Sequence, residues 1–301
     1  MRALKSNFVQ PDALKDEEIS RATLEGLLQR LRGGVLLLPG KESVPAPAPF
    51  YSDVLANHIG YARAGSFTNE RVAELDKALA NFATRRVDAV VLDLRASTVS
   101  SEFEIAAEMA KRFVPKGKTM WTLHDTAAHQ DQVFTNDRDP AFSGTTIALI
   151  DADTSGAAEA VAAAMKAKPQ TLLIGQPSAG RAVRYSDFPL ASGKILRVAV
   201  AEVIGPDGKS IFPGGVKPDL VVEQISLAQK RQIFAQSMQR GMAPFVFEPE
   251  RPHFNEAALI AGTNPELENR QQRRTSEENL HDPVLQHAVD VITSLAVFRE
   301  R

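Results

Sequence analysis

The chain has 301 residues and a formal net charge of -2, with 44% hydrophobic and 24% charged residues. This length and mixture indicate a globular protein of one large domain or two smaller ones, and they exclude a disordered or fibrous chain. The balanced charge argues against a nucleic-acid-binding surface over the whole molecule. Because the sequence contains no cysteine, a disulfide framework, a thiolate metal cluster and a cysteine nucleophile are excluded.

The beginning of the sequence predicts an amphipathic helix. Asp16-Glu17-Glu18 favours a helix start, and Gly33-Gly34 favours its end. Between them, four leucines fall on one helical face: Leu24, Leu27, Leu28 and Leu31. The start lacks the apolar stretch of a secretory signal, and the longest aliphatic run, Val35 to Leu38, is too short to span a membrane. The alternating prolines from Val44 to Pro49 predict a stiff, extended linker.

From Ile59 onward the pattern changes to alternating strands and helices. Apolar runs predict strands at 59–63, 89–92, 120–123, 145–150 and 171–174. Residues at helical spacing predict helices at 72–82, 105–113 and 157–168. Repeated strand–helix–strand units predict an α/β fold with a mainly parallel sheet. Ligands bind beyond the carboxyl ends of such strands, so the loops after Leu94, Ile150 and Ile174 are the places to examine.

The remainder of the chain is predicted to hold further β-structure, a solvated segment and a final helix. Residues 194–203 are β-rich, residues 205–208 form a turn, and residues 251–279 are polar and irregular. In the last helix Asp282 is the expected cap and Pro283 lies in the first turn. An apolar stripe follows: Leu285, Ala288, Val289, Ile292 and Leu295.

Several short stretches occur in an order that carries further information. They are Ile59-Gly60-Tyr61, Val91-Leu92-Asp93-Leu94-Arg95, Phe113-Val114-Pro115-Lys116-Gly117-Lys118, Ala157-Ala158-Glu159, Gly205-Pro206-Asp207-Gly208-Lys209-Ser210-Ile211 and Gly215-Val216-Lys217-Pro218-Asp219. From about Phe8 to Val222, the chain resembles the carboxyl-terminal processing, or tail-specific, serine peptidases. The resemblance implies an α/β, ClpP/crotonase-like spiral core of βα units with helical N- and C-terminal regions.

The resemblance also implies a division into regions. These are a helical region at 1–34, a proline-rich linker at 35–57, a peptidase-like core at 58–226 and a helical region at 227–301. Most family members carry a peptide-binding PDZ domain between the first helical region and the core. Residues 35–57 are too few for such a domain, so we expect a PDZ-less member.

The family's catalytic positions all carry other residues in this chain. Members use a Ser nucleophile at the turn into a helix, a Lys base and usually a Gln that positions the Lys. With Glu159 and Gly175 as anchors, the nucleophile position is Gly156, the base position Arg181 and the supporting position Tyr185. Glycine has no nucleophilic group, and arginine stays protonated in proteins. The resemblance therefore favours a pseudoenzyme, although it leaves the question of activity open.

A further family feature is missing after the Asp-Leu-Arg strand. Members have a Gly-rich turn there, whose backbone amide helps to form the oxyanion hole, whereas this chain has Ala96-Ser97-Thr98-Val99-Ser100. Without the glycines, a close approach of the backbone to a ligand is harder to achieve.

Ser155 is the candidate for a displaced nucleophile, and Ser100 and Ser101 are weaker candidates. The side chains of neighbouring residues at a helix start point about 100° apart, so the side chain of Ser155 points in a different direction from that of residue 156. Ser155 also has no assigned base. The more common role of such a residue, or of Thr154, is to cap the helix.

Other polar residues have both functional and structural interpretations. His58 is a possible base, but a structural role is favoured. Arg181 and Arg184 are candidates for holding a peptide's terminal carboxylate, or they are solvated or paired with Asp187. A polar segment that we predict to be a loop contains a loose cluster of His124, Asp125, His129 and Asp131. Their spacing fits no strong metal-ligand motif, and we expect no metal and no cofactor.

Two functions from different classes remain. The favoured one is a non-catalytic relative of these peptidases that binds a peptide or protein, and the alternative is an active serine endopeptidase that cleaves near C-termini with a displaced nucleophile such as Ser155. Acyl-thioester chemistry ranks last because it rests on fold analogy. The terminal helices predict a homodimer or larger assembly, because an exposed leucine stripe is costly. A location in the bacterial envelope or outside it follows from the resemblance alone.

Overall fold

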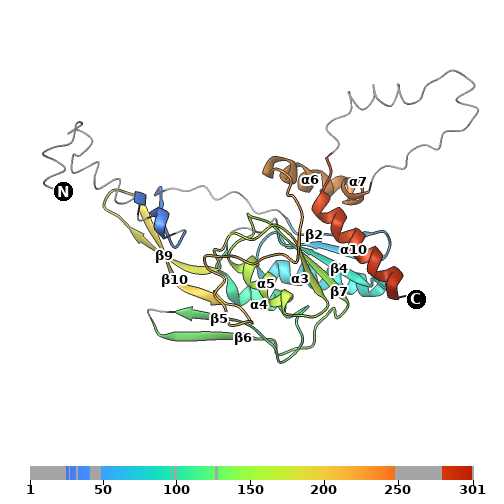
Figure 1. Ribbon diagram of the computed structural model, residues 1–301, viewed down its shortest axis with the longest axis horizontal. Coiled ribbons are helices and arrows are strands. Elements are labelled where there is room, and N and C mark those ends of the chain that lie inside the picture. Colours follow the sequence, from blue (N-terminus) through green and yellow to red (C-terminus); the bar gives the residue numbers. More distant parts are fainter. Residues whose placement is uncertain are drawn as a thin grey trace, which may run out of the picture.

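The computed structural model describes residues 25–26, 28–31, 33–40, 49–95, 97, 100–125, 128–247 and 280–299. Its core is a six-stranded sheet, here called the central sheet, with helices on both faces (Figure 1). In spatial order the strands are β11 (Leu220–Val221), β8 (Thr171–Gly175), β7 (Thr145–Ile150), β4 (Ala89–Asp93), β3 (Ile59–Arg63) and β2 (Tyr51–Leu55). Neighbouring strands are parallel except for β2 and β3.

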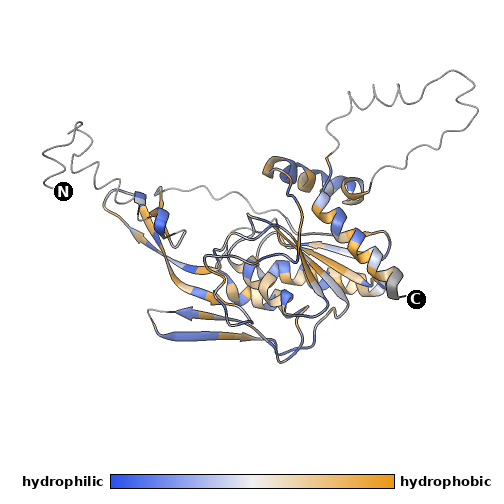
Figure 2. Ribbon diagram, viewed as in Figure 1, coloured by the Kyte–Doolittle hydropathy of each residue, from blue (hydrophilic) through white to orange (hydrophobic). Residues whose placement is uncertain are grey.

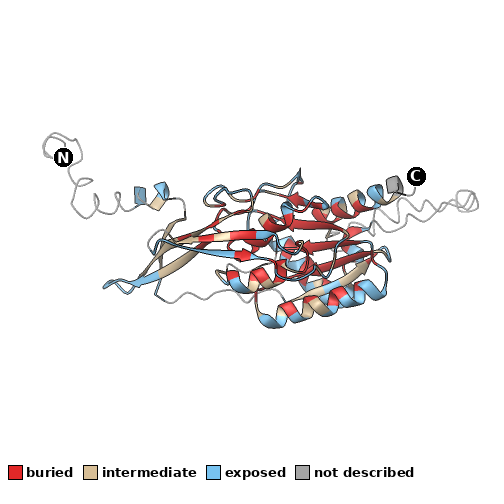
Figure 3. Ribbon diagram, turned by 90° about the horizontal axis from the view of Figure 1, so that it is seen from below, coloured by how far each residue is buried: buried red, intermediate tan, exposed pale blue. Residues whose placement is uncertain are grey.

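Two helical layers cover the central sheet. One contains α3 (Asn69–Thr84), α4 (Phe103–Ala110) and α5 (Ala157–Lys166), and the other contains α6 (Leu227–Arg240), α7 (Ala243–Val246) and α10 (Pro283–Arg299). Because side chains alternate across a strand, Val90 and Leu92 of β4 pack in the first layer's core and Val91 in the second. Strands β3, β4 and β7 in the middle of the sheet are buried throughout (Figure 3), which explains the continuous apolar sequences of β4 and β7.

The second sheet is antiparallel and extends away from this core (Figure 1). It contains β1 (Val35–Leu38), β9 (Val183–Pro189), β10 (Ile195–Ile204), β5 (Thr119–Asp125) and β6 (Gln130–Thr135). Strand β10 is long and pairs with β1, β9 and β5 in turn. Apolar and polar residues are mixed along these strands (Figure 2), as expected for strands that are only partly covered.

The predicted α/β fold class is confirmed, but two predictions about β5 and its surroundings are wrong. Residues 120–123 lie in an antiparallel sheet rather than in the parallel one, because β7 pairs directly with β4 and leaves β5 no place between them. The polar segment around His124 and Asp131 was expected to be a loop, yet these two residues face each other across the β5–β6 hairpin. The strands of an exposed hairpin alternate apolar and polar residues, whereas a strand buried on both faces is a continuous apolar run.

The segment expected to be a linker contributes strands at both of its ends. β1 and β2 lie within residues 35–57, and the residues between them, 41–48, lie outside the described residues. Strand β1 depends on β10, far along the chain, so local sequence could not indicate its pairing. The four region boundaries stay predictions. Most of the predicted first helix and all of segment 251–279 also lie outside the described residues.

The last helix and its cap are confirmed. Helix α10 begins at Pro283, and Leu285 N donates to Asp282 Oδ1 (3.1 Å). Asp282 also accepts hydrogen bonds from the buried guanidinium of Arg95, at the end of β4 (2.7 and 2.9 Å). Lys230 of α6 donates to Asp151, at the end of β7, and to Asp153 (2.9 Å). We call Arg95, Asp282, Lys230 and Asp151 the clasp, because they join the C-terminal helices to the central strands.

In the described part of the chain, no helix is long and apolar enough to cross a membrane.

Candidate functional site

The turn between β7 and α5 lies at the carboxyl edge of the central sheet. Thr154 closes this turn: its Oγ1 accepts from Asp151 N and donates to Asp151 Oδ1 (3.0 and 3.1 Å). The cap of α5 is Gly156, with φ 63° and ψ -125°, so neither Thr154 nor Ser155 has the capping role expected for it. A residue with a side chain rarely adopts this backbone conformation.

A carbonyl group fills the space beside Gly156. A Cβ atom on Gly156 would lie 2.3 Å from Ser100 O, well inside van der Waals contact. The same carbonyl oxygen accepts a hydrogen bond from Ala157 N, the first amide of α5 (2.8 Å). The loop that follows β4 is therefore packed onto the first turn of α5, and the amide there is already used.

Glu159 organises the other side of the turn. Its Oε1 accepts from Ser178 Oγ (2.5 Å) and Gly180 N (2.6 Å). Its Oε2 accepts from Arg181 N (2.7 Å) and Gly156 N (3.0 Å). Burial raises the pKa of Glu159, while these four hydrogen bonds act in the opposite direction. One buried carboxyl group thus holds the start of α5 against residues 178–181.

Arg181 and Tyr185 lie on the chain that enters and forms β9. The Tyr185 hydroxyl donates to Gly33 O (2.9 Å), and burial raises the pKa of that hydroxyl. The Arg181 side chain is exposed, whereas its backbone amide is fixed by Glu159. The structure therefore brings Gly156 and Arg181 together through one carboxylate oxygen, and it directs Tyr185 toward the segment before β1.

Arg184 has a different partner from the one considered. Its guanidinium donates to Glu104 on α4 (2.9 Å), and both side chains are substantially exposed. Asp187 instead binds Arg197 on β10 (2.7 Å). Arg184 therefore already has an acidic partner, while Arg181 makes no side-chain hydrogen bond to the described residues.

The candidate serines differ in their surroundings. Ser155 is only 1% exposed, and its hydroxyl has no hydrogen-bond partner among the described residues. The Ser101 hydroxyl donates to Val183 O (3.4 Å), and the Ser100 hydroxyl accepts from Glu102 N (3.1 Å). In the described part of the chain, none of the three is hydrogen-bonded to an imidazole or an amine.

The histidines lie away from this turn. His58 Nδ1 donates to Ala56 O (2.6 Å), a structural contact. His124 binds Asp131 across the β5–β6 hairpin (2.6 Å), and this hydrogen bond raises the pKa of His124. His129 lies in the turn of the same hairpin. Among the described residues, no three His, Asp or Glu side chains gather as metal ligands would.

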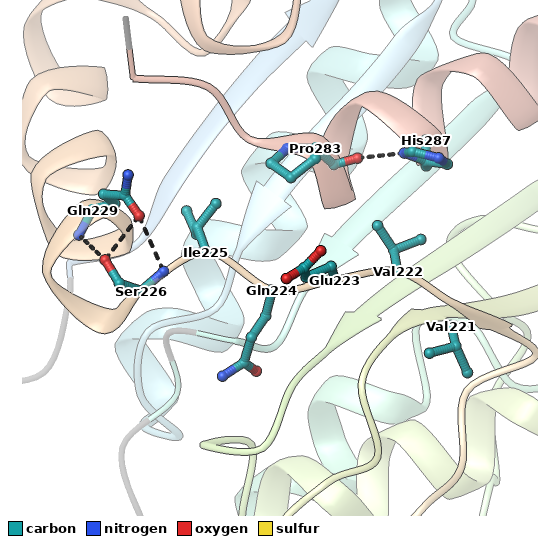
Figure 4. A pocket seen from close by; sticks show the side chains of 9 residues that line it. All are labelled: Val221, Val222, Glu223, Gln224, Ile225, Ser226, Gln229, Pro283 and His287. Carbon is teal, nitrogen blue, oxygen red and sulfur yellow. Dashed lines mark hydrogen bonds between the residues drawn. The ribbon is translucent and has the colours of Figure 1, made fainter. Parts of the chain in front are cut away.

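A shallow pocket lies near this edge, between the chain after β11 and the C-terminal helices (Figure 4). It has a volume of about 500 Å³ and is lined by residues 221–226, Gln229, Pro283 and His287. The His287 ring is hydrogen-bonded to Pro283 O (2.8 Å), as Figure 4 shows. Glu223 is the carboxylate in the lining, so this pocket does not favour an anion.

Comparison with known proteins places this arrangement in a family. The model of peptidase family S41 matches residues 58–222, which is more than half of the chain. The chain belongs to peptidase family S41. It is 27% identical over 173 residues to a carboxyl-terminal-processing protease of Synechocystis, and 25% identical over 191 residues to carboxy-terminal processing protease CtpA of Bacillus subtilis. These matches cover 57% and 64% of this chain but only 40% of each relative.

Solved structures show the same S41 fold. The chain superposes on a protein of Parabacteroides merdae with a TM-score of 0.57 at 16% identity, covering 72% of this chain and 79% of that one. It also superposes on a lipoprotein of Streptococcus agalactiae with a TM-score of 0.51 at 16% identity, covering 78% and 91%. For the photosystem II D1 C-terminal processing protease the TM-score is 0.50 at 19% identity, covering 70% and 54%.

Two features of this S41 site were missed in the sequence. The first is the contact between Ser100 O and the start of α5, which joins segments far apart in the chain. The second is Ser178, whose hydroxyl donates to Glu159 and accepts from Val216 N (2.7 Å). Glu159 was used only as an alignment anchor, and its position in the first turn of an Ala-rich helix was the available signal for a buried acid with several hydrogen bonds.

Proposed function

We propose that this S41 member binds a peptide or protein segment without hydrolysing it. The proposal uses the alignment in which Gly156 stands at the nucleophile position, Arg181 at the base position and Tyr185 at the supporting position. Its main support is the packing of Ser100 O against the start of α5. A side chain at position 156 would lie 2.3 Å from that oxygen.

The same contact bears on the oxyanion hole. A backbone N–H just after a nucleophile, at a helix start, is a common donor to the developing oxyanion. Here Ala157 N already donates to Ser100 O (2.8 Å). The family's nucleophile and its oxyanion donor would therefore both need the Ser100 carbonyl group to move. Gly156 has no side chain, and Ala157 N already has an acceptor. Both observations support the loss of acyl-transfer activity.

The base position supports the same function. A lysine can remove a serine proton when burial makes it neutral, whereas a guanidinium stays charged. Arg181 also lies on the exposed surface. It remains suited to holding an anionic group of a bound peptide, while Arg184 first has to leave Glu104.

The alternative is an active endopeptidase that uses Ser155. The observation in its favour is that the Ser155 hydroxyl is unpaired among the described residues, next to the family's nucleophile position. Against it, the hydroxyl is almost fully buried and bonded to no base there. A substrate carbonyl would need the surrounding turn to open before it could reach that oxygen.

The experiment compares cleavage and binding in the same samples. Purified protein is incubated with an unstructured peptide, and the products are followed by mass spectrometry, while a fluorophosphonate probe reports any reactive serine. We expect no cleavage and no labelling, and the same result for Ser155→Ala. The variant Gly156→Ser with Arg181→Lys should also be inactive, because Ser100 O occupies the site. Cleavage that disappears in Ser155→Ala but persists in the matched control Ser101→Ala would establish the alternative.

Assembly and location belong to the same proposal. The apolar stripe of α10 is buried in the protein's own core, so we propose a homodimer or larger assembly through the N-terminal helix, and a location in the bacterial envelope or outside it. Support comes from the carboxyl-terminal processing proteases among the relatives and from the predicted leucine stripe at residues 24–31. Light scattering that returned a mass of 32.7 kDa at micromolar concentration would contradict the assembly.

A further inference from the structure

The second sheet ends in a three-stranded ribbon that extends away from both helical layers (Figures 1 and 3). Strand β10 lies in the middle of the ribbon, with β1 on one side and β9 on the other. A turn at residues 190–194 joins β9 to β10, and Leu190 N donates to Lys194 O across it (2.8 Å). We call residues 37–40 and 188–196 the ribbon tip.

The ribbon tip is apolar on both faces. Because side chains alternate along a strand, two rows of apolar side chains cross the three strands, one row on each face. They are Leu37, Leu196 and Phe188 on one face, and Leu38, Ile195 and Pro189 on the other. None of these six residues is buried, and Phe188 is 49% exposed. Leu190, in the turn, is 38% exposed. Apolar surface therefore meets water all around the end of the ribbon.

The charges of the ribbon leave its tip with one cation. Asp187 and Arg197 face each other across β9 and β10 just behind the tip, where they form a bidentate pair (2.7 and 2.9 Å). The tip itself contains no acidic residue. Its one charged residue, Lys194, is exposed, and the ammonium group of Lys194 has no partner among the described residues. The tip is thus both apolar and cationic, in a chain whose net charge is -2.

The two apolar faces limit what can cover the tip. A folded partner that packs on one face of the ribbon leaves the other face in water, and an exposed apolar face is costly. A lipid surface surrounds both faces at once, because acyl chains are fluid. The length of the tip fits such a surface: from Lys194 to Arg197 the chain rises by about 10 Å, and interfacial segments bury their apolar side about 5 to 10 Å deep at the boundary of headgroups and acyl chains.

We propose that the ribbon tip inserts into the surface of a membrane that contains anionic lipids. Phe188 and Leu190 enter the acyl boundary, and the long side chain of Lys194 reaches back to the lipid phosphates. The pair of Asp187 and Arg197 stays on the water side. In the described part of the chain, the outer edges of β1 and β9 pair with no strand. Such edges would be unsatisfied in hydrocarbon, so the tip stays at the interface. The proposal goes beyond peptide binding and does not depend on it.

Sedimentation with vesicles of phosphatidylcholine and phosphatidylglycerol measures the binding. We expect the unmodified chain to bind, and the double variant Phe188→Ser, Leu190→Ser to bind at least tenfold more weakly, because two large apolar side chains are removed from the lipid. The matched control is Val133→Ser, which removes a 58% exposed apolar side chain from β6 of the same sheet and should bind like the unmodified chain. Lys194→Glu should weaken binding at least fivefold on these vesicles and much less on phosphatidylcholine alone.

A tryptophan placed at the tip reports insertion. The native Trp121 is fully buried, so its emission should not change when vesicles are added. The variant Phe188→Trp should gain a blue-shifted emission with vesicles, and brominated lipids should quench that emission. Val133→Trp, the matched control, should show neither change.

Absence of vesicle binding, equal binding of the double variant, or an unshifted emission of Phe188→Trp would overturn the proposal. If no chain bound vesicles and light scattering showed that the double variant had lost an assembly, the tip would lie between two copies, which also overturns it. Peptide binding, measured on the same samples, should be equal in the unmodified chain and the double variant, so lipid insertion and the proposed function can fail separately. Circular dichroism should show all variants folded.

Discussion

Replacing Gly156 by alanine directly tests the packing of Ser100 O against the start of α5. The added Cβ atom would lie 2.3 Å from Ser100 O, so the loop after β4 has to move by about 1.1 Å or more to restore an ordinary contact. That movement weakens the hydrogen bond from Ala157 N and leaves a buried donor without its acceptor, at a cost of about 1 to 3 kcal/mol. The positive φ of 63° adds about 1 to 3 kcal/mol for a residue with a side chain.

Gly117→Ala separates the two effects. Gly117 has φ 78°, and nothing lies within 4 Å of the Cβ atom that it would carry. We expect this control to lose about 1 kcal/mol, the backbone cost alone, and Gly156→Ala to lose about 3 kcal/mol or more. Urea denaturation followed by circular dichroism measures both losses. If Gly156→Ala lost no more stability than Gly117→Ala, Ser100 would not be packed on this position, and the main support for the non-catalytic function would be gone.

Three further predictions follow from buried or paired charges. Glu159→Gln should lose about 3 kcal/mol of stability, because one oxygen that accepts two hydrogen bonds becomes a donor. Glu108→Gln, at a half-exposed helix position, should lose less than about 0.5 kcal/mol in the same urea measurement. Burial acts to raise the pKa of Asp93, but the Arg95 guanidinium holds it below its ordinary value, so its stabilisation is present above about pH 4 and is lost as pH falls through the lowered pKa. The urea midpoint should therefore fall between pH 6 and pH 3 by more in the unmodified chain than in Asp93→Asn; an equal fall would refute this. The hydrogen bond that His124 donates to Asp131 raises the pKa of His124, so the pair's stabilisation is present below the ordinary pKa of about 6.5 and is lost as pH rises through the raised value. In an NMR titration Asp131→Asn should bring the His124 pKa down, and an unchanged value would exclude the pairing.

The elements that sequence predicted well are those whose burial is locally uniform. Strands β4 and β7 lie between two helical layers, so every residue is buried and the apolar run is continuous. By contrast, β1 is a short apolar run that was assigned to a linker, because its partner β10 lies far along the chain. The β5–β6 hairpin was misjudged because its exposed positions, His124 and Asp131, look like loop residues when their cross-strand pairing is unknown.

The candidate site shows the same limit. The turn before α5 and the importance of position 156 were readable from neighbouring residues, as was the end of β4. The contacts that decide its chemistry were not, because Ser100 O and Glu159 act on backbone groups far from them in sequence. The partner of Arg184 was also misjudged: Asp187 is closer in sequence, but Glu104 on α4 is closer in space. Long-range backbone contacts of this kind leave no residue pattern of their own.

The clasp has a consequence for how the chain folds during synthesis. Strands β4 and β7 are complete once residue 150 has been made, yet the buried ends of these strands receive Lys230 and Asp282 much later. Until then, the carboxylate of Asp151 has no ammonium partner, and the apolar face of the sheet that α6 and α10 cover stays open. We therefore expect the central sheet to close only after the C-terminal helices have left the ribosome. A fragment cut at residue 226, the boundary that family resemblance suggests, should then be a poor folding unit.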